Sequence, residues 1–215
     1  YYNTPKEARR ADRSQHLATA TATMALADAG ETALDPARCG VIYATGVGGL
    51  QTFEEQVIVH DRKGERRVSP FMVPMIMPNA PGAAISMKFG LQGPNETVTT
   101  ACAASTHALG YATRLIQMGY ADLIVSGGTE SVMSPVGMAG FQNMTALSSS
   151  GHSMPFDKNR DGFMMTEGSA TLVLEELSSA QERGATIYGE ILGSGSNADA
   201  HHITAPAPGG MGAFR

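Results

Sequence analysis

The sequence predicts an α/β domain in which helices cover both faces of a sheet. Apolar or β-branched runs at 41–45, 97–100, 123–125 and 170–175 are typical of strands, and segments of helical character separate them along the chain. The run at 123–125 is continuously apolar, which suits a strand that is covered on both faces. Strands and helices that alternate in this way pack as layers on the two sides of one sheet.

Capping residues mark the expected helix ends. Thr4 to Glu7 has the form of a capping box with Pro at the first helical position, and Asp12 can cap a longer helix that ends at Ala29. The segment 103–118 is small and apolar on nearly all sides, which predicts a buried helix. Further helices are predicted at 50–62, about 78–88 and 176–183, and a further strand at 186–192. Irregular structure is predicted at 71–77, 134–154 and 193–210.

Composition narrows the class of protein. A chain of 215 residues is long enough for one large domain or two small ones, and 42% apolar residues are ordinary for a soluble protein. No run of about 18 apolar residues predicts a membrane helix, and the start has no signal-peptide pattern. A net charge of −5 gives no support for nucleic-acid binding. Two cysteines cannot form a disulfide framework, so we expect a cytoplasmic location. No metal site is expected.

Cys102 is the candidate nucleophile. It stands where the strand at 97–100 turns into the helix at 103–118. Unpaired N–H groups at a helix N-terminus stabilise negative charge, so they favour a reactive thiolate and can also hold the oxygen of a thioester under attack. The alternative is a buried, inert cysteine, which is common in proteins.

Several motifs together carry a family resemblance. They are the Thr100 to Ser105 segment around Cys102, Gly127-Gly128-Thr129-Glu130, Pro155-Phe156-Asp157 with Arg160 to Phe163, and Glu167-Gly168. In this combination the chain resembles the β-ketoacyl-acyl-carrier-protein synthases, most of all the elongating synthase II group, which also occurs as ketosynthase domains of polyketide synthases. The resemblance implies the thiolase fold, two similar α/β halves stacked as five layers. It also implies that Cys102 accepts an acyl chain from a carrier protein, before decarboxylative condensation with malonyl-carrier protein.

The resemblance implies further site residues. Val47 resembles the residue that gates the acyl pocket, Phe141 an aromatic on the wall of that pocket, and Met72 and Val73 residues that reach across a dimer into the partner's pocket. Any of these apolar residues could instead be plain core. Six basic residues resemble the patch that receives the acidic carrier protein, although a charge run is usually just a solvated face: Lys6, Arg9, Arg10, Lys63, Arg66 and Arg67. Thr145 stands near a place where the family often has another arginine. Asp161, Phe163 and Glu167 resemble framework around the site.

The same resemblance implies a fragment. Residues 1–185 correspond to the N-terminal half without its first strand, and 186–215 to the start of the C-terminal half. The family's two catalytic histidines and its lysine lie further on, so we expect the chain to be inactive alone. His107, His201 and His202 match none of them and are expected to be packing or surface residues. No cofactor is expected, because phosphopantetheine arrives on the carrier protein. A homodimer is expected, with the strand at 96–100 paired across its axis.

Two other functions fit the same sequence. One is a relative without condensation activity, such as a chain-length factor or a carrier-docking scaffold, which typically lacks the cysteine. The other is a thiolase-superfamily enzyme that acts on coenzyme A thioesters. The stretches 160–163 and 127–130 favour the synthases that take acyl groups from a carrier protein over the enzymes that act on coenzyme A thioesters.

Overall fold

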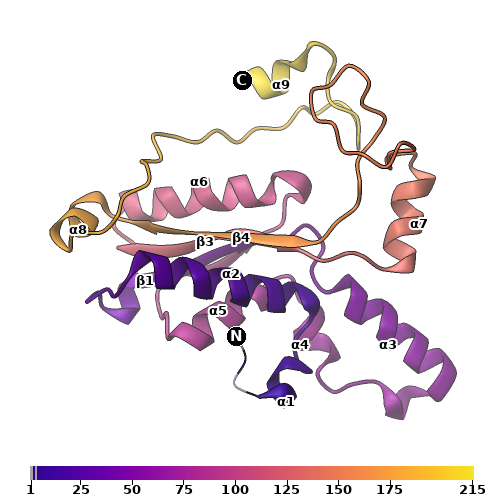
Figure 1. Ribbon diagram of the computed structural model, residues 1–215, viewed down its shortest axis with the longest axis horizontal. Coiled ribbons are helices and arrows are strands. Elements are labelled where there is room, and N and C mark those ends of the chain that lie inside the picture. Colours follow the sequence, from indigo (N-terminus) through magenta and orange to yellow (C-terminus); the bar gives the residue numbers. More distant parts are fainter. Residues whose placement is uncertain (1, 3) are drawn as a thin grey trace.

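A four-stranded sheet forms the centre of the computed structural model, which describes Tyr2 and residues 4–215 (Figure 1). The strand order is β2-β1-β3-β4. β1 is parallel to β2 and to β3, whereas β4 is antiparallel to β3. The strands are β1 (Cys39–Ala44), β2 (Asn95–Val98), β3 (Leu123–Glu130) and β4 (Gly168–Glu175), so the four strands predicted up to residue 175 are present with shifted ends.

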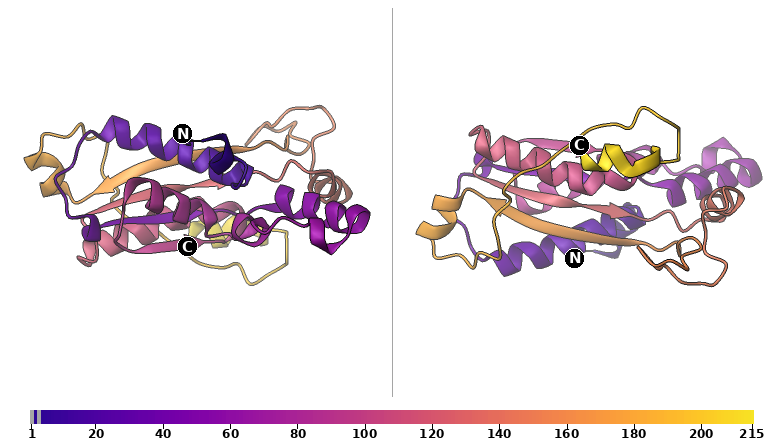
Figure 2. Two further views of the ribbon diagram at one scale, coloured as in Figure 1. Left: turned by 90° about the horizontal axis from the view of Figure 1, so that it is seen from below. Right: turned by 90° about the horizontal axis from the view of Figure 1, so that it is seen from above.

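Helices cover both faces of this sheet, as predicted (Figure 2). α2 (Arg13–Ala29) and α5 (Ala80–Phe89) pack on one face, and α6 (Ala104–Gln117) packs on the other. α3 and α7 lie beyond the end of the sheet at which β1 and β3 finish, and α8 lies at the opposite end. The remaining helices are α1 (Pro5–Ala8), α3 (Leu50–Lys63), α4 (Met72–Ile76), α7 (Pro135–Asn143), α8 (Leu177–Glu182) and α9 (Met211–Phe214).

The alternation of side chains along β1 builds two cores. Val41 and Tyr43 join the cluster under α2 and α5, whereas Ile42 and Ala44 join the cluster under α6. All six residues of β1 are buried. Complete burial of a valine or isoleucine side chain contributes about 1.5–3 kcal/mol, so this central strand fixes the position of both helical layers.

A buried carboxylate attaches α2 to α3. Asp12 is the N-cap of α2, where its side chain accepts a hydrogen bond from the Ser14 N–H at 2.8 Å, and Gln15 completes the capping box. Its other carboxylate oxygen accepts a hydrogen bond from the Thr52 hydroxyl of α3 at 2.6 Å. Asp12 is 2% exposed. The predicted cap therefore also holds in place the helix that follows the end of β1.

Four predictions about the elements are wrong. The segments 71–77 and 134–154 contain the short helices α4 and α7, which begin where Phe71 and Ser134 precede a proline-containing turn. Residues 186–192 form no strand, since their backbone pairs with no strand of the described chain. The helix at 103–118 is buried only on the side that faces the sheet. Its other side carries polar, exposed residues such as Thr106 and Arg114.

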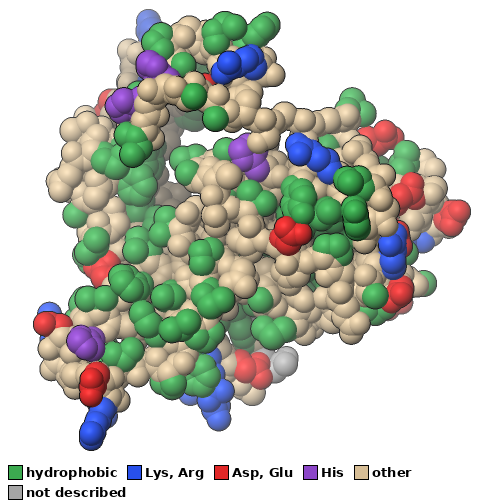
Figure 3. All heavy atoms as spheres, turned by 180° about the vertical axis from the view of Figure 1, so that it is seen from behind, with side chains coloured by type: hydrophobic (Ala, Val, Ile, Leu, Met, Phe, Trp, Pro, Cys, Tyr) green, Lys and Arg blue, Asp and Glu red, His purple; other side chains and the backbone are tan. Residues whose placement is uncertain are grey.

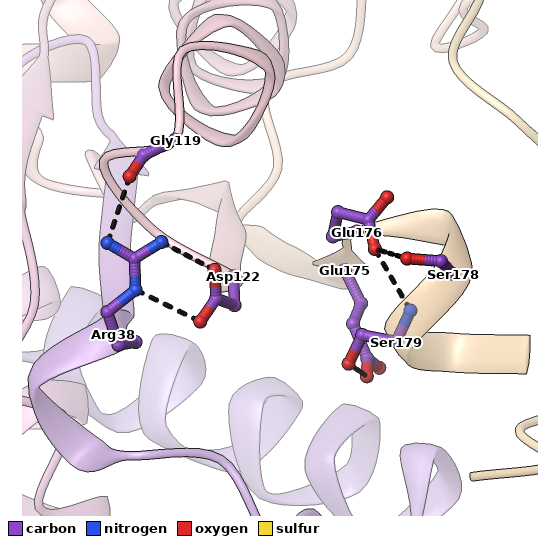
Figure 4. A network of polar contacts seen from close by, with 7 residues as sticks. All are labelled: Arg38, Gly119, Asp122, Glu175, Glu176, Ser178 and Ser179. Atoms are coloured by element: carbon purple, nitrogen blue, oxygen red, sulfur yellow. Dashed lines mark hydrogen bonds and ion pairs between the residues drawn. The ribbon is translucent and has the colours of Figure 1, made fainter. Parts of the chain in front are cut away.

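Arginine–carboxylate pairs tie strand ends together at the edge of the sheet opposite to Cys102. Arg38, just before β1, donates two hydrogen bonds to Asp122, just before β3, at 3.0 and 2.6 Å, and a third to the Gly119 carbonyl (Figure 4). Arg183, which follows α8, likewise forms a bidentate ion pair with Glu175 at the end of β4. Paired donors of this kind fix geometry as well as adding energy, so this edge anchors the sheet.

We expect Arg38→Ala to lower stability at neutral pH and to have a smaller effect in acid, where the contribution of Asp122 is lost. The hydrogen bonds from Arg38 hold the pKa of Asp122 below its ordinary value of 3.8. A carboxylate whose folded-state pKa is depressed adds stability above its unfolded pKa, and this stability is lost as the pH falls through the folded pKa. The difference in urea midpoint between wild type and variant should therefore shrink once the pH falls below 3.8.

The control is Arg62→Ala, which removes an exposed arginine from the last turn of α3. This variant should leave the urea midpoint unchanged both at neutral pH and at acidic pH. A difference for Arg38→Ala that stays constant from neutral to acidic pH would contradict the role given to the ion pair.

Candidate active site

Cys102 lies in a short 3₁₀ turn, η3 (Ala101–Ala103), that joins β2 to α6. The Ala103 N–H donates to the Thr100 carbonyl at 3.2 Å, and the chain then enters α6 without a side-chain cap. The predicted place of Cys102 between a strand and a helix is confirmed. The alternative of a buried, inert thiol is wrong, since Cys102 is exposed.

The residue before the cysteine has an unusual backbone conformation. Ala101 has a φ of +51°, in the left-handed region that residues with a Cβ seldom adopt. Such conformations persist where the surrounding structure holds them, and they cluster at functional sites. Here the conformation occurs in η3, directly before the exposed Cys102, where the chain passes from β2 into α6.

The C-terminal segment returns to this site. An open hollow of about 870 Å³ is lined on one side by Thr100 to Ala103 with His107, and on the other by residues between Gly195 and Arg215. Seen from behind, the surface is hollowed beneath the arch of this segment (Figure 3). Hydrogen bonds within the segment hold its shape, from Asn197 to the Gly212 carbonyl at 3.1 Å and from the Ala207 N–H to Asp199 at 2.8 Å.

Two histidines line the hollow, where the sequence predicted packing or surface positions. His107 is half-buried on α6, and its Nδ1 lies 2.8 Å from the Thr100 hydroxyl. His202 accepts hydrogen bonds at Nδ1 from the N–H groups of Thr204 and Ala205, at 3.1 and 3.0 Å. Because Nδ1 is an acceptor, the proton of a neutral His202 ring lies on Nε2. One feature of the sequence is compatible with this return of the chain: its end is rich in glycine, and Gly212 is buried against Asp199.

The predicted pocket residues lie outside the hollow. Val47 is exposed in the turn after β1, and this turn packs on α4, which carries Met72 and Val73. The contact is close, because the Gly49 N–H donates to the Ile76 carbonyl at 3.3 Å. The structure therefore brings three of the four predicted residues to neighbouring segments, although none of them lines the hollow.

Phe141, the fourth predicted pocket residue, lies on α7. Its ring meets that of Phe163 edge to face, with centroids 5.5 Å apart. α7 is attached to α3, because the Val136 N–H donates to the Glu54 carboxylate at 3.3 Å. Phe141 thus lies near the same end of the sheet as the other predicted residues, but with an aromatic partner that the sequence assigned to the framework.

Comparisons with known proteins decide the family. Residues 2–180 match the beta-ketoacyl synthase N-terminal domain. The chain belongs to the beta-ketoacyl synthase family. A curated relative, the 3-oxoacyl-[acyl-carrier-protein] synthase 2 of Synechocystis sp., is 46% identical over an alignment of 217 residues that covers 98% of this chain and 52% of that protein. The chain spans about half the length of the curated relatives that it matches.

Solved ketosynthase structures share the fold. A beta-ketoacyl synthase from Burkholderia phymatum is similar with a TM-score of 0.81 and 33% identity, over 94% of this chain and 51% of that one. A type II polyketide ketosynthase in complex with its acyl-carrier protein gives a TM-score of 0.73 and 27% identity, over 86% of this chain and 52% of that one. The predicted thiolase-like α/β fold is confirmed.

The six basic residues predicted to bind the carrier are all exposed and fall in two places. Lys6, Arg9 and Arg10 lie on and after α1, and Lys63, Arg66 and Arg67 lie at the end of α3 and in the turn that follows. One contact links the two places, since the Arg10 guanidinium stacks 4.1 Å from the centre of the Phe71 ring, shortly after Arg67. The six cations therefore stand on neighbouring segments at the end of the molecule that carries α4.

The predicted framework residues hold loops around the site. The Asp161 carboxylate accepts hydrogen bonds from Ser148, Ser149 and Ser150, and these bonds hold its pKa far below the ordinary value. Arg13, and secondarily the Ser131 hydroxyl, lower the pKa of Glu167, which thereby connects α2 to the segment after β3. Both carboxylates are thus engaged by the protein itself, which agrees with a supporting role.

Residues 2 and 4–215 hold no group of three or more histidine, cysteine or acidic side chains that could bind a metal ion. No helix in this described part of the chain is long and apolar enough to cross a membrane.

We expect a small alkylating reagent to label Cys102 and to spare Cys39. Cys39 is 4% exposed within the core, and burial raises the pKa of its thiol, so both access and thiolate content are low. Brief treatment of the native protein with iodoacetamide, followed by peptide mass spectrometry, should place the label at residue 102. Equal labelling of both cysteines before unfolding would contradict the exposure of one and the burial of the other.

Proposed function

We propose that the protein containing this chain is a β-ketoacyl-acyl-carrier-protein synthase of the elongating type and that Cys102 is its acyl acceptor. The observation that carries the proposal is the exposed thiol of Cys102 in η3, at the start of a helix and at the rim of an open hollow. Family membership supports it, as does the name of the Synechocystis relative, a 3-oxoacyl-[acyl-carrier-protein] synthase 2.

In the first step the Cys102 thiolate attacks the carbonyl carbon of an acyl thioester. A new C–S bond forms to Cys102, the bond to the carrier's sulfur breaks, and the carrier leaves as a free thiol after taking up a proton. Backbone N–H groups at the start of α6 are positioned to hold negative charge on the oxygen under attack. The carrier brings phosphopantetheine with it, so this step needs no cofactor bound by the chain itself.

In the second step a malonyl thioester loses carbon dioxide, and its α-carbon attacks the acyl-cysteine. A C–C bond forms, and the bond to Cys102 breaks and restores the thiolate. We propose that residues 186–215 begin the second half of the enzyme and that groups beyond them stabilise the enolate of this step. The return of the 195–215 segment to Cys102 supports this division, because it brings the second unit directly to the nucleophile.

The acyl chain needs an apolar site. We propose that Val47, Phe141, Met72 and Val73 supply it, the last two in the pocket of a second copy. The exposure of Val47 and Val73 supports this assignment, since 51% and 59% of these residues is exposed in the single chain. The edge strand β2, which pairs on one side only, is the strand we propose to meet its copy in a homodimer.

The decisive experiment compares acyl donors on the whole protein that carries this chain. Incubation with acyl-carrier protein should add one acyl group at Cys102, and Cys102→Ala should abolish the addition while the melting temperature stays within a few degrees. Acyl-CoA should react far more slowly, which separates this function from a coenzyme A enzyme. Acylation at Cys39, or equal rates from both donors, would refute the proposal.

A second prediction concerns docking of the acidic carrier. Reversal of Lys63, Arg66 and Arg67 to glutamate should slow association with acyl-carrier protein by about tenfold to a hundredfold at low salt, because complementary charges act mainly on the association rate. The rate of Cys102 alkylation by iodoacetamide should not change. Lys158→Glu, which reverses an exposed charge in the loop before Asp161, is the matched control. Binding that is indifferent to the triple reversal and to salt would exclude this patch.

A further inference from the structure

The carboxylate of Glu130 fastens the turn that follows β1. Glu130 is the last residue of β3, and its two oxygens accept hydrogen bonds from the Thr45 hydroxyl at 3.1 Å and from the Gly46 N–H at 2.7 Å. Thr45 in turn accepts a hydrogen bond from the Gly48 N–H at 3.1 Å. One side chain on β3 therefore sets the path of the chain on both sides of Val47.

The Glu130 carboxylate forms both of its hydrogen bonds with residues of the turn. Glu130 is half-buried, and the described residues offer it no ion pair with an arginine, lysine or histidine. A hydrogen bond to an ionised acceptor is stronger than one between neutral groups. The negative charge is therefore held by the backbone and hydroxyl of the turn.

The fit of the turn is tight on both sides. A methyl group added to Gly46 would lie 2.5 Å from Glu130 Oε2 and 3.8 Å from the Cα of Ala101, the residue before Cys102. On the other side, a methyl group on Gly48 or Gly49 would lie 2.9 or 2.6 Å from the carbonyl oxygens of Ile76 and Met75 in α4. The turn thus lies beside the Cys102 loop (residues 99–103) and packs tightly on the helix that carries Met72 and Val73.

We propose that Glu130 is a positioning residue that holds the Val47 turn against the Cys102 loop and so determines which chain lengths reach the thiol. The inference builds on the proposed function, since it concerns access to the same cysteine. Glu130 touches no reacting atom. It acts through Thr45 and Gly46, and loss of its carboxylate should release Val47 and remove the support of the strained Ala101.

The test measures chain-length selectivity rather than activity alone. Alkylation rates of Cys102 by iodoacetamide and by a long N-alkyl iodoacetamide, together with acyl transfer from short- and long-chain acyl-carrier protein, give two independent ratios. Glu130→Ala should change the long-to-short ratio by about tenfold or more, since small displacements at a reacting centre have effects of this size. Thr45→Val should act in the same direction. Glu130→Gln should have a smaller effect, because its amide oxygen can still accept from Gly46.

Two controls separate positioning from general destabilisation. Glu175→Ala breaks the ion pair at the opposite edge of the sheet, so it should lower the melting temperature and leave the ratio unchanged. Gly46→Ala should shift the ratio in the wild-type protein but add little to Glu130→Ala, because the crowded carboxylate is then gone.

An unchanged ratio in folded Glu130→Ala and Thr45→Val, or an equal shift in Glu175→Ala, would overturn the inference. Absence of acylation in the wild type would refute the proposed function alone. The alkylation ratio would still decide the role of Glu130.

Discussion

The parallel pairing of β1 with β2 and with β3 is the constraint on which the site depends. Parallel strands end at the same edge of a sheet, so the segments after β1, β2 and β3 must meet there. These segments are the Val47 turn, the Cys102 loop and the stretch that begins at Glu130. The two buried cores pack against these strands from both faces, and the Arg38–Asp122 pair joins the starts of β1 and β3 at the opposite edge. The position of Cys102 follows from this arrangement before any catalytic group is considered.

Two glycines of β3 allow neighbouring elements to pack closely at this edge of the sheet. A methyl group on Gly127 would collide with the Ala170 carbonyl of β4, and one on Gly128 would collide with the Ser105 hydroxyl in the first turn of α6. The missing side chain of Gly128 therefore allows α6 to approach β3 closely, and that of Gly127 allows the close approach of β4. The sequence reads as a strand that ends at Val125, whereas the pairing with β4 continues to Glu130. Gly127 and Gly128, which follow the predicted strand, are in fact part of β3, and the first turn of α6 lies against Gly128.

The sequence correctly predicted features that depend on residues close to one another along the chain. The Asp12 cap, the apolar run of β3 and the strand-to-helix position of Cys102 depend on neighbours in sequence, and all three are found. The same reasoning failed where distant partners decide. Residues 186–192 are rich in β-branched and aromatic types but find no strand to pair with in the described chain, and α4 depends on its contact with the turn at Gly49. The return of His202 to Cys102 joins residues that are remote in sequence, so no periodicity could reveal it.

The Cys102 loop lies between the Val47 turn and the C-terminal segment, and each of these two elements is held by hydrogen bonds of its own. On one side lies the Val47 turn, which Glu130 fastens to β3 and in which a methyl group on Gly46 would come within 3.8 Å of the Ala101 Cα. On the other side the loop faces the C-terminal segment, whose hydrogen bonds from Asn197 and to Asp199 lie within the segment itself. The sheet therefore fixes where the thiol stands, and in our proposal the Val47 turn and the C-terminal segment, both outside the sheet, control what can reach it. Such a division lets specificity change by substitution in a turn or a tail without disturbing the core, because neither element contributes to the two buried clusters.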